Sequence, residues 1–313
     1  MPCVRGKLRA RAAAVLGAVA AFTLVSTGRP VHAGAYEIAV VQSLENPVYD
    51  KTIEGFEATC GGEVTTYTLD KVTKTLNAND LADIKSRKPS AILAIGPSAL
   101  LEIFSKKPPM PVVFTAITEK PANVSPAAGV LMNVPMDKQL ETLLKIAPNV
   151  KSVGVVYSKA KTAYFVADLE RAAKAKNIAV QAVDAATAQD AVKALSALFN
   201  SADAIFLAPD TTVHSPQLEQ LAGKLSAQKK KAVVGFRGSQ LSNGFLFASE
   251  MDPLEMGKQA GDVTKQILAG KKPANLYEPV RKYKLILNTK VAAQLDLTVP
   301  ADVSAGAKIF GDE

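Results

Sequence analysis

Short runs of apolar, β-branched residues alternate with segments of helical periodicity along most of this chain. Continuous apolar runs, in place of alternating ones, indicate strands that are buried on both faces. Their alternation with helices indicates right-handed βαβ units and parallel sheets. The predicted strands are Ile38–Gln42, Val64–Leu69, Ala91–Ile95, Val112–Ala116, Val130–Asn133, Val153–Tyr157, Val180–Val183, Ala204–Ala208, Val233–Phe236 and Phe245–Ala248. The predicted helices are one that begins at Pro47, then Asp80–Ser86, Ser98–Ser105, Asp137–Ile146, Tyr164–Lys176, Ala188–Phe199, Pro216–Gln228 and Pro253–Leu268.

This number of strands fits two sheets of about five better than one large sheet, since strongly twisted open sheets rarely exceed about ten strands. The pattern also starts again at Lys151–Ser158, and no long linker interrupts it. We therefore predict an α/β fold of two doubly wound parallel-sheet lobes joined by short hinge crossings. The predicted division places residues 34–134 and 251–278 in one lobe, and residues 135–250 and 279–313 in the other.

The first 33 residues have the features of a signal peptide. Four positive charges lie between Arg5 and Arg11, an apolar to weakly polar stretch follows over residues 12–25, and Val31-His32-Ala33 resembles a small-residue cleavage site. A stretch of this length is shorter than the roughly 20 apolar residues of a membrane span. No cysteine follows that would carry a lipid anchor. We predict cleavage after Ala33 and export to a bacterial periplasm.

The net charge is +8, from 37 Lys and Arg against 29 Asp and Glu, but this value includes the predicted leader. Five of these charges lie in residues 1–33, so the remaining 280 residues carry only +3. The chain has no tryptophan, and aromatic residues make up 6%. These features argue against a nucleic-acid partner.

Sequence signatures of catalysis, metal and cofactor binding are missing. The chain contains no GxGxxG, GxxxxGK[ST] or GxSxG motif. Two histidines and two cysteines make a metal centre improbable, so we predict no metal, no cofactor and no enzymatic activity. After the leader, His214 is the one histidine, interpreted as a surface loop residue, and Cys60 the one thiol, expected to be buried.

Polar residues follow the carboxyl ends of the predicted strands in both halves of the chain, where ligands bind in parallel α/β sheets. In the first half these residues are Ser43, Glu45, Asn46, Asp50, Gly96, Pro97, Ser98, Thr115 and Thr118. In the second half they are Ser158, Thr162, Tyr164, Asp210, Thr211, Arg237 and Ser239. Each one alone could equally cap a helix or form a turn, and Asn46 and Ser98 are predicted to be caps in any case. Their recurrence in both halves favours a ligand-binding cleft between the lobes.

Five segments in this order also resemble one protein family. They are Gln42–Asp50, Pro111–Thr118, Lys151–Ser158, Asp203–Val213 and Met256–Gly261. On these segments the chain resembles the ABC-transporter substrate-binding proteins of the tryptophan/tyrosine-binding (TrpX-like) group. The similarity extends from about Ala35 to Val303. It implies the type 1 periplasmic binding protein fold and capture of a small solute for a membrane permease.

The resemblance also implies roles for individual residues. It places the family's Pro-x-x-Asp on Pro47 and Asp50, and its turn after the third strand on Gly96, Pro97 and Ser98, where a ligand carboxylate could meet helix N–H groups. It places the family's Phe-Thr segment on Phe114–Thr118, and its Asp-x-Thr-Val on Asp210–Val213, with Asp210 facing a ligand ammonium.

One position departs from the family pattern. Acidic and hydroxyl residues are usual after the strand that ends at Phe236, whereas this chain has Arg237-Gly238-Ser239-Gln240. An arginine can bind a carboxylate bidentately, which opens the site to a ligand with a second anionic group. Without tryptophan, ring stacking would fall to Tyr49, Tyr164 or Phe236.

The sequence thus predicts a monomeric periplasmic solute-binding protein. Its ligand would be a small carboxylated molecule, an amino acid (aromatic ones included) or a related anion, and its transient partners an ABC permease and ATPase of the inner membrane. A ligand-sensing partner of a membrane receptor would have the same lobes, and neighbouring genes would separate the two. A periplasmic enzyme on the same scaffold is disfavoured by the shortage of acid–base groups.

Overall fold

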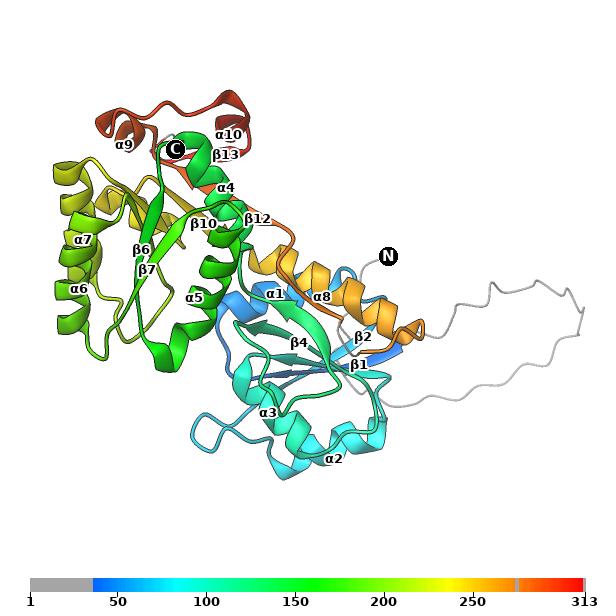
Figure 1. Ribbon diagram of the computed structural model, residues 1–313. Helices are drawn as coiled ribbons and strands as arrows, with labels where there is room; N and C mark the ends of the chain where they lie inside the picture. Colours follow the sequence, from blue (N-terminus) through cyan, green and yellow to red (C-terminus); the bar gives the residue numbers. More distant parts are fainter. Residues whose placement is uncertain (1–35, 274–275, 312–313) are drawn as a thin grey trace, which may run out of the picture. The chain divides into compact units, whose positions relative to one another are not determined.

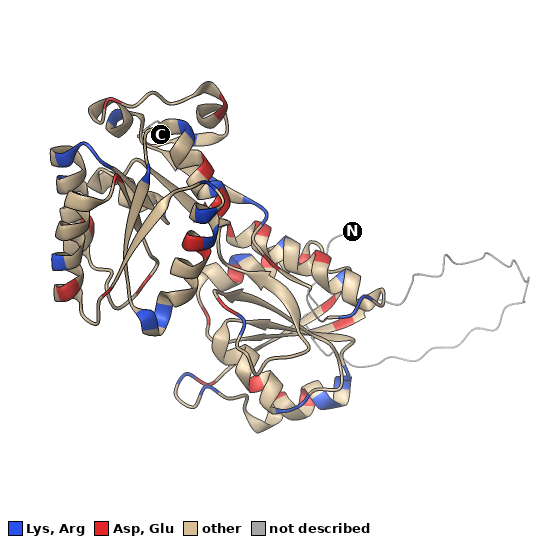
Figure 2. Cartoon of the chain, in the orientation of Figure 1, with Lys and Arg blue, Asp and Glu red and all other residues tan. Residues whose placement is uncertain are grey.

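The computed structural model describes residues 36–273 and 276–311, which form two compact units. The first unit runs up to Val130 and includes Gly257–Tyr277, and the second comprises Leu131–Met256 and the chain from Glu278 onward. The predicted signal peptide lies outside the described residues. Within the described ranges, no helix is long and apolar enough to cross a membrane. Basic and acidic residues are interspersed along the helices of both units (Figure 2).

A six-stranded sheet forms the centre of the first unit, in the order β11-β5-β4-β3-β1-β2. Its strands are β1 (Tyr36–Gln42), β2 (Gly62–Thr68), β3 (Ala91–Ile95), β4 (Val112–Ile117), β5 (Ala128–Leu131) and β11 (Tyr277–Pro279). β1 pairs in parallel with both β2 and β3, and β3 pairs in parallel with β4. The register sets Gln42 opposite Ile95, so β1 and β3 end side by side, and Thr115 of β4 lies opposite Ile95.

Four helices cover this sheet: α1 (Pro47–Glu57), α2 (Ala78–Arg87), α3 (Pro97–Ser105) and α8 (Pro253–Leu268). Figure 1 shows α1 and α8 on one face and α2 and α3 on the other. The predicted start of α1 is confirmed, because Asn46 is the N-cap, accepts a hydrogen bond from Tyr49 N, and is followed by proline. Cys60 is buried, as predicted.

Close contact between α1 and α8 depends on two glycines. A Cβ on Gly257 would lie 1.9 Å from the carbonyl oxygen of Thr52, and one on Gly261 would lie 2.1 Å from Thr59 Oγ1. Thr59 Oγ1 also donates a hydrogen bond to the carbonyl of Lys258, at 3.0 Å. Gly257 and Gly261 are four residues apart, so they lie on the same face of α8 and let the two helices approach closely.

The second unit contains a seven-stranded sheet in the order β13-β12-β10-β9-β8-β6-β7. Its strands are β6 (Ser152–Tyr157), β7 (Ala179–Asp184), β8 (Ala204–Leu207), β9 (Ala232–Gly235), β10 (Phe247–Met251), β12 (Tyr283–Leu287) and β13 (Ala307–Ile309). β12 runs antiparallel to β10, while the other pairings described in this sheet are parallel.

The α/β prediction is confirmed. The expectation of about five parallel strands per sheet is wrong, because β11, β12 and β13 are short or half-exposed and lack a continuous buried apolar run.

Two apolar clusters pack on the two faces of this sheet. Val153 and Val155 of β6 belong to the cluster with α4 and α5, whereas Val156 belongs to the cluster with α6 and α7. The alternation follows from the two-residue period of a strand. The helices of this unit are α4 (Met136–Ile146), α5 (Lys159–Lys174), α6 (Ala188–Ser201), α7 (Pro216–Lys229), the 3₁₀ helix η1 (Gly238–Asn243), α9 (Thr289–Gln294) and α10 (Ala301–Ala305).

Candidate functional site

In the first unit, Ser43 joins the end of β1 to the start of α3. Its hydroxyl donates a hydrogen bond to the carbonyl of Ile95, at 3.0 Å, and accepts one from Ala99 N, at 2.9 Å. Ser43 therefore caps α3 from a neighbouring strand. The prediction that Ser98 caps this helix is wrong. The N-cap is Gly96, which makes no side-chain capping bond.

Tyr49 and Gly96 lie beside Ser43 at the start of α3, and these three residues form a corner of the first unit. Gly96 has a φ of 87°, and a Cβ there would lie 2.3 Å from the Tyr49 hydroxyl and 2.7 Å from Ser43 Oγ. Burial raises the pKa of Tyr49, and its hydrogen bond with Ser43 offsets part of that rise. The phenol is therefore neutral at physiological pH. A side chain larger than hydrogen at position 96 would displace both hydroxyls.

Two polar groups near this corner have no partner among the described residues. Pro97 has no N–H and Ala99 N donates to Ser43, which leaves Ser98 N–H without a protein acceptor at the positive end of α3. Thr115 Oγ1, in the adjacent β4 opposite Ile95, is buried and also unpaired within the described residues. Such an arrangement suits an anionic oxygen. Of the other predicted residues in this unit, Glu45 and Asp50 are exposed, and Thr118 is half-buried.

In the second unit, Asp210 links the ends of β6 and β8. Its carboxylate accepts hydrogen bonds from Ser158 N at 2.8 Å, Thr212 N at 2.7 Å, Val213 N at 3.3 Å, and the Thr162 hydroxyl. Burial raises the pKa of Asp210, but these four hydrogen bonds outweigh it and lower the pKa overall. Asp210 is therefore ionised, and its acceptor positions are engaged within its own unit.

The contact with Asp210 also changes the start of α5. Thr162 has a non-helical conformation (φ −129°, ψ 25°), and the helix begins at Lys159, ahead of the predicted Tyr164. Tyr164 is half-buried and packs against the core beside α4 and α5. Ser158 is the N-cap of α5 but makes no side-chain capping bond. Thr211 is exposed and accepts a hydrogen bond from Lys161, at 2.8 Å.

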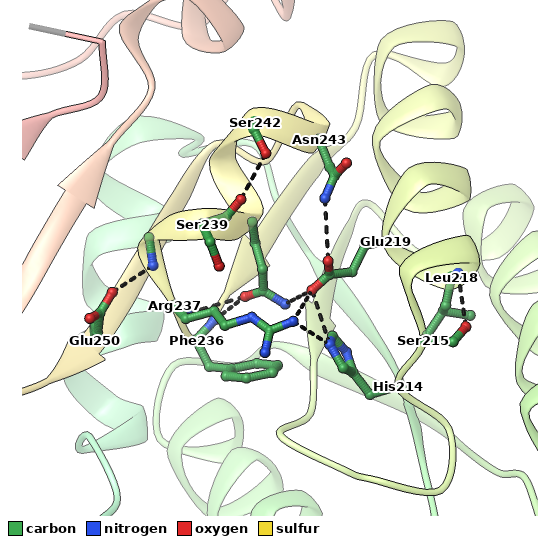
Figure 3. Close-up of polar contacts among 12 residues, drawn as sticks. His214, Ser215, Leu218, Glu219, Phe236, Arg237, Ser239, Ser242, Asn243 and Glu250 are labelled. Atoms are coloured by element: carbon green, nitrogen blue, oxygen red, sulfur yellow. Dashed lines mark hydrogen bonds and ion pairs between the residues drawn. The ribbon is translucent and has the colours of Figure 1, made fainter. Parts of the chain in front are cut away.

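Arg237 lies in a polar cluster centred on Glu219, which only the structure reveals (Figure 3). Arg237 Nη2 lies 3.0 Å from Glu219 Oε1 and 2.7 Å from His214 Nε2. Gln240 Nε2 donates to Glu219 Oε1 at 2.7 Å, and Asn243 Nδ2 donates to Oε2 at 3.3 Å. The side chain of Glu219 is 9% exposed and that of Arg237 is 45% exposed. A buried carboxylate therefore anchors a guanidinium whose Nε and Nη1 donate to no described residue.

His214 lies in a loop, as predicted, but its side chain is not at the surface. Its side chain is 16% exposed, and its ring meets the Phe236 ring edge-on at 5.3 Å between centroids. Burial lowers the pKa of His214; Glu219 raises it and Arg237 lowers it, with a net fall. A guanidinium can only donate, so Nε2 accepts from Arg237 and the proton of the neutral ring is assigned to Nδ1. Nδ1 is buried without a partner in the described part of the chain.

The remaining predicted residues, Phe236 and Ser239, flank this cluster. The Phe236 ring is half-buried and lies 5.4 Å from the Arg237 guanidinium carbon. Ser239 is exposed, and its carbonyl accepts a hydrogen bond from Ser242 at 2.8 Å. Glu219 gave no sequence signal of its own, because an acid in the first turn of a helix is an ordinary feature. Arg237 was predicted to meet a ligand carboxylate, and its pairing with Glu219 was not predicted.

Polar groups at strand ends of a two-unit α/β scaffold are typical of a ligand-binding protein. Comparison with known families makes the class specific: the chain belongs to the ABC transporter substrate binding proteins, which it matches over residues 37–309. This is a family of binding proteins and not of enzymes.

A curated relative is the "Tyrosine-binding protein" of Clostridioides difficile (strain R20291), 24% identical over 227 residues. The match covers 68% of this chain and 64% of that relative's length. It supports the predicted resemblance to the tryptophan/tyrosine-binding group.

Two solved structures share the fold. One is a ligand-free, open substrate-binding protein with adhesive properties from Clostridium difficile, with a TM-score of 0.70, 18% identity, and coverage of 89% of this chain and 100% of that one. The other is an ABC domain in complex with L-Trp from Streptococcus pneumonia, with a TM-score of 0.59, 20% identity, and coverage of 88% and 100%. At these identities the comparison shows the fold, which confirms the predicted periplasmic binding protein architecture.

Proposed function

We propose that this chain is a periplasmic solute-binding protein that captures a small carboxylated solute for ABC-type import. The solute is an amino acid, aromatic ones included, or a related anion. The observation that carries the proposal is the family match over residues 37–309. Two similar proteins, a tyrosine-binding protein and a domain with bound L-Trp, support an amino acid as ligand.

The first unit would supply the carboxylate contact. The unpaired Ser98 N–H lies at the positive end of α3, and the Ser43 and Tyr49 hydroxyls adjoin the N-cap Gly96. Backbone N–H groups at a helix N-terminus bind anions without a charged side chain. Thr115 of β4, which lies opposite Ile95, has a buried hydroxyl without a partner among the described residues. We assign the α-carboxylate of the ligand to this corner.

The second unit would supply the contacts that select the rest of the ligand. The Phe236 ring and the open Nε and Nη1 of Arg237 suit a planar or anionic group. Asp210 is assigned a scaffolding part, because four protein donors already engage its carboxylate. Its interaction with a ligand ammonium, expected from the resemblance, would then act through charge and not through a direct hydrogen bond.

Capture would proceed by hinge closure. A ligand that contacts residues of both units in the closed state stabilises that state by its differential affinity. The permease and its ATPase in the inner membrane would recognise the closed form. The chain would reach the periplasm through the leader at residues 1–33 and act there as a monomer.

Native mass spectrometry of freshly purified protein tests the proposal. We expect a carried-over small molecule whose mass fits an amino acid or an organic anion, released when the protein is unfolded. A chain that carries no solute, and whose melting temperature no amino acid or dicarboxylate raises, would contradict the proposal. Chemical conversion of the bound compound would point to an enzyme instead.

A further inference from the structure

A cavity of about 440 Å³ lies within the first unit, at the opposite end of β3 from Ser43. It is formed by the last turns of α2, the turn that leads into β3, the end of α3 and the loop before β4. None of the residues predicted to bind ligand lines it. Its volume falls in the range of about 300–1,000 Å³ that is typical of small-molecule sites.

The floor of the cavity is apolar. Ile84, Ile92 and Ile103 line it, and each is at most 5% exposed. Leu81 and Met110 form half-buried walls. No acidic side chain lines the cavity. The floor therefore favours a hydrocarbon chain or ring over a polar solute such as a sugar.

Prolines keep the walls from collapsing into this space. Pro89, Pro108 and Pro109 line the cavity, and each has a fixed φ and no N–H to pair. Lys88, which precedes Pro89, is fixed in a left-handed conformation at the end of α2. A cavity with such walls is preformed, so an occupant would not have to order the protein around it.

Three lysines surround the mouth of the cavity: Lys85, Lys88 and Lys106. Lys106 lies 3.2 Å from Glu102 Oε1, whereas Lys85 and Lys88 have no ion pair within the described residues. The carboxyl ends of α2 and α3 contribute about half a negative charge each. The net charge at the mouth is therefore roughly +1, since the three lysines are offset by the Glu102 carboxylate and the two helix ends.

We propose that this cavity binds a small amphipathic monoanion, with its apolar part on the isoleucine floor and its single carboxylate at Lys85 and Lys88. The roughly single net positive charge at the mouth suits one anionic group. A free amino acid is disfavoured, because its ammonium group would lie among lysines and no acidic side chain lines the cavity. The site is therefore chemically distinct from the proposed solute site and does not depend on it.

Calorimetry with decanoate, well below its micelle concentration, tests the proposal on the purified chain. We expect saturable binding of one molecule per chain and no binding of decyltrimethylammonium, which has the same tail and the opposite charge. Met110→Trp, which fills the cavity from a half-buried wall, should weaken decanoate binding more than tenfold. Lys85→Gln with Lys88→Gln should weaken it by roughly two- to fivefold, the range that exposed ion pairs supply.

The matched control is Lys71→Gln with Lys74→Gln, two exposed lysines of the same unit that do not line the cavity. It should leave decanoate affinity unchanged. Leu81→Asn provides a second test should Met110→Trp not fold. Binding without saturation, equal binding of the cationic tail, or affinity that neither cavity variant alters would show adventitious association only and would overturn the proposal.

Discussion

The guanidinium of Arg237 is anchored by Glu219, with 3.0 Å between Nη2 and Oε1, and the same nitrogen lies 2.7 Å from His214 Nε2. Glu219 is buried, so it could not lose Arg237 without leaving a desolvated carboxylate in the interior. The pairing also neutralises much of the arginine's charge. An anionic ligand group would therefore meet an oriented set of N–H donors and not a free cation.

Glu219→Ala tests the importance of this anchor for stability. Gln240 is fully buried and donates to Glu219, so its amide would lose its acceptor. We expect the free energy of unfolding to fall by about 1–3 kcal/mol, as for other buried groups left unpaired. Urea denaturation measures it. The exposed Glu170→Ala serves as a control and should change it by less than about 0.5 kcal/mol. Equal effects of the two substitutions would show that the cluster contributes nothing.

Asp210→Asn should reveal a pH-dependent contribution to stability. The pKa of Asp210 is lower in the folded protein than its ordinary value, so its contribution is fully present above that ordinary pKa of about 3.9. It is lost as the pH falls through the folded pKa. The difference in unfolding free energy between wild type and Asp210→Asn should thus shrink between pH 6 and pH 3. Asp296→Asn, with a side chain that is 82% exposed, should show no comparable trend. A difference that grows on acidification would contradict the assignment.

Gly257→Ala should destabilise the first unit by overpacking. The added Cβ would lie 1.9 Å from a backbone oxygen of α1, which cannot rotate away as a side chain could. We expect a loss of about 1–3 kcal/mol in differential scanning calorimetry or urea unfolding. Gly306→Ala is the control, because its Cβ would have no neighbour closer than 3.8 Å. A Gly257→Ala protein as stable as the control would show that α1 and α8 do not pack as described.

Ser98→Pro tests the backbone N–H of residue 98 separately from the Ser98 side chain. Proline is tolerated in the first turn of a helix but lacks the N–H proposed to meet the ligand carboxylate. Affinity for the native solute should fall more than tenfold, while Ser98→Ala, which retains the N–H, should bind almost normally. Circular dichroism would confirm that both variants are folded. Similar affinities for the two variants would exclude this N–H from the site.

Strands buried on both faces and helices with clear caps were predictable from the sequence. β3 and α8 have the predicted bounds, because an unbroken apolar run defines the first and Pro253 the start of the second. β12 was missed because its half-exposed Tyr-Lys-Leu-Ile-Leu pattern is ambiguous and its pairing with β10 is decided by tertiary contacts.

In the candidate site, too, some residues could be predicted from the sequence and others could not. Strand ends pointed to Ser43, Asp210 and Arg237, since those positions follow from the topology of parallel sheets. Their partners did not follow: Ser43 caps a helix 56 residues away, and Asp210 holds Thr162 across 48 residues. Local sequence carries no signal for such pairs. The role of Glu219 could be seen only once η1 and α7 were brought together.

Calorimetric titration of the purified chain with L-tyrosine, L-tryptophan and their carboxamides tests the central claim most directly. The carboxamides retain the ring and the ammonium group but lack the carboxylate proposed to meet the start of α3. The account predicts saturable 1:1 binding of at least one free amino acid, and a loss of more than tenfold in affinity for its carboxamide. Equal affinity for acid and amide, or binding of neither amino acid nor of any other carboxylated solute, would contradict it.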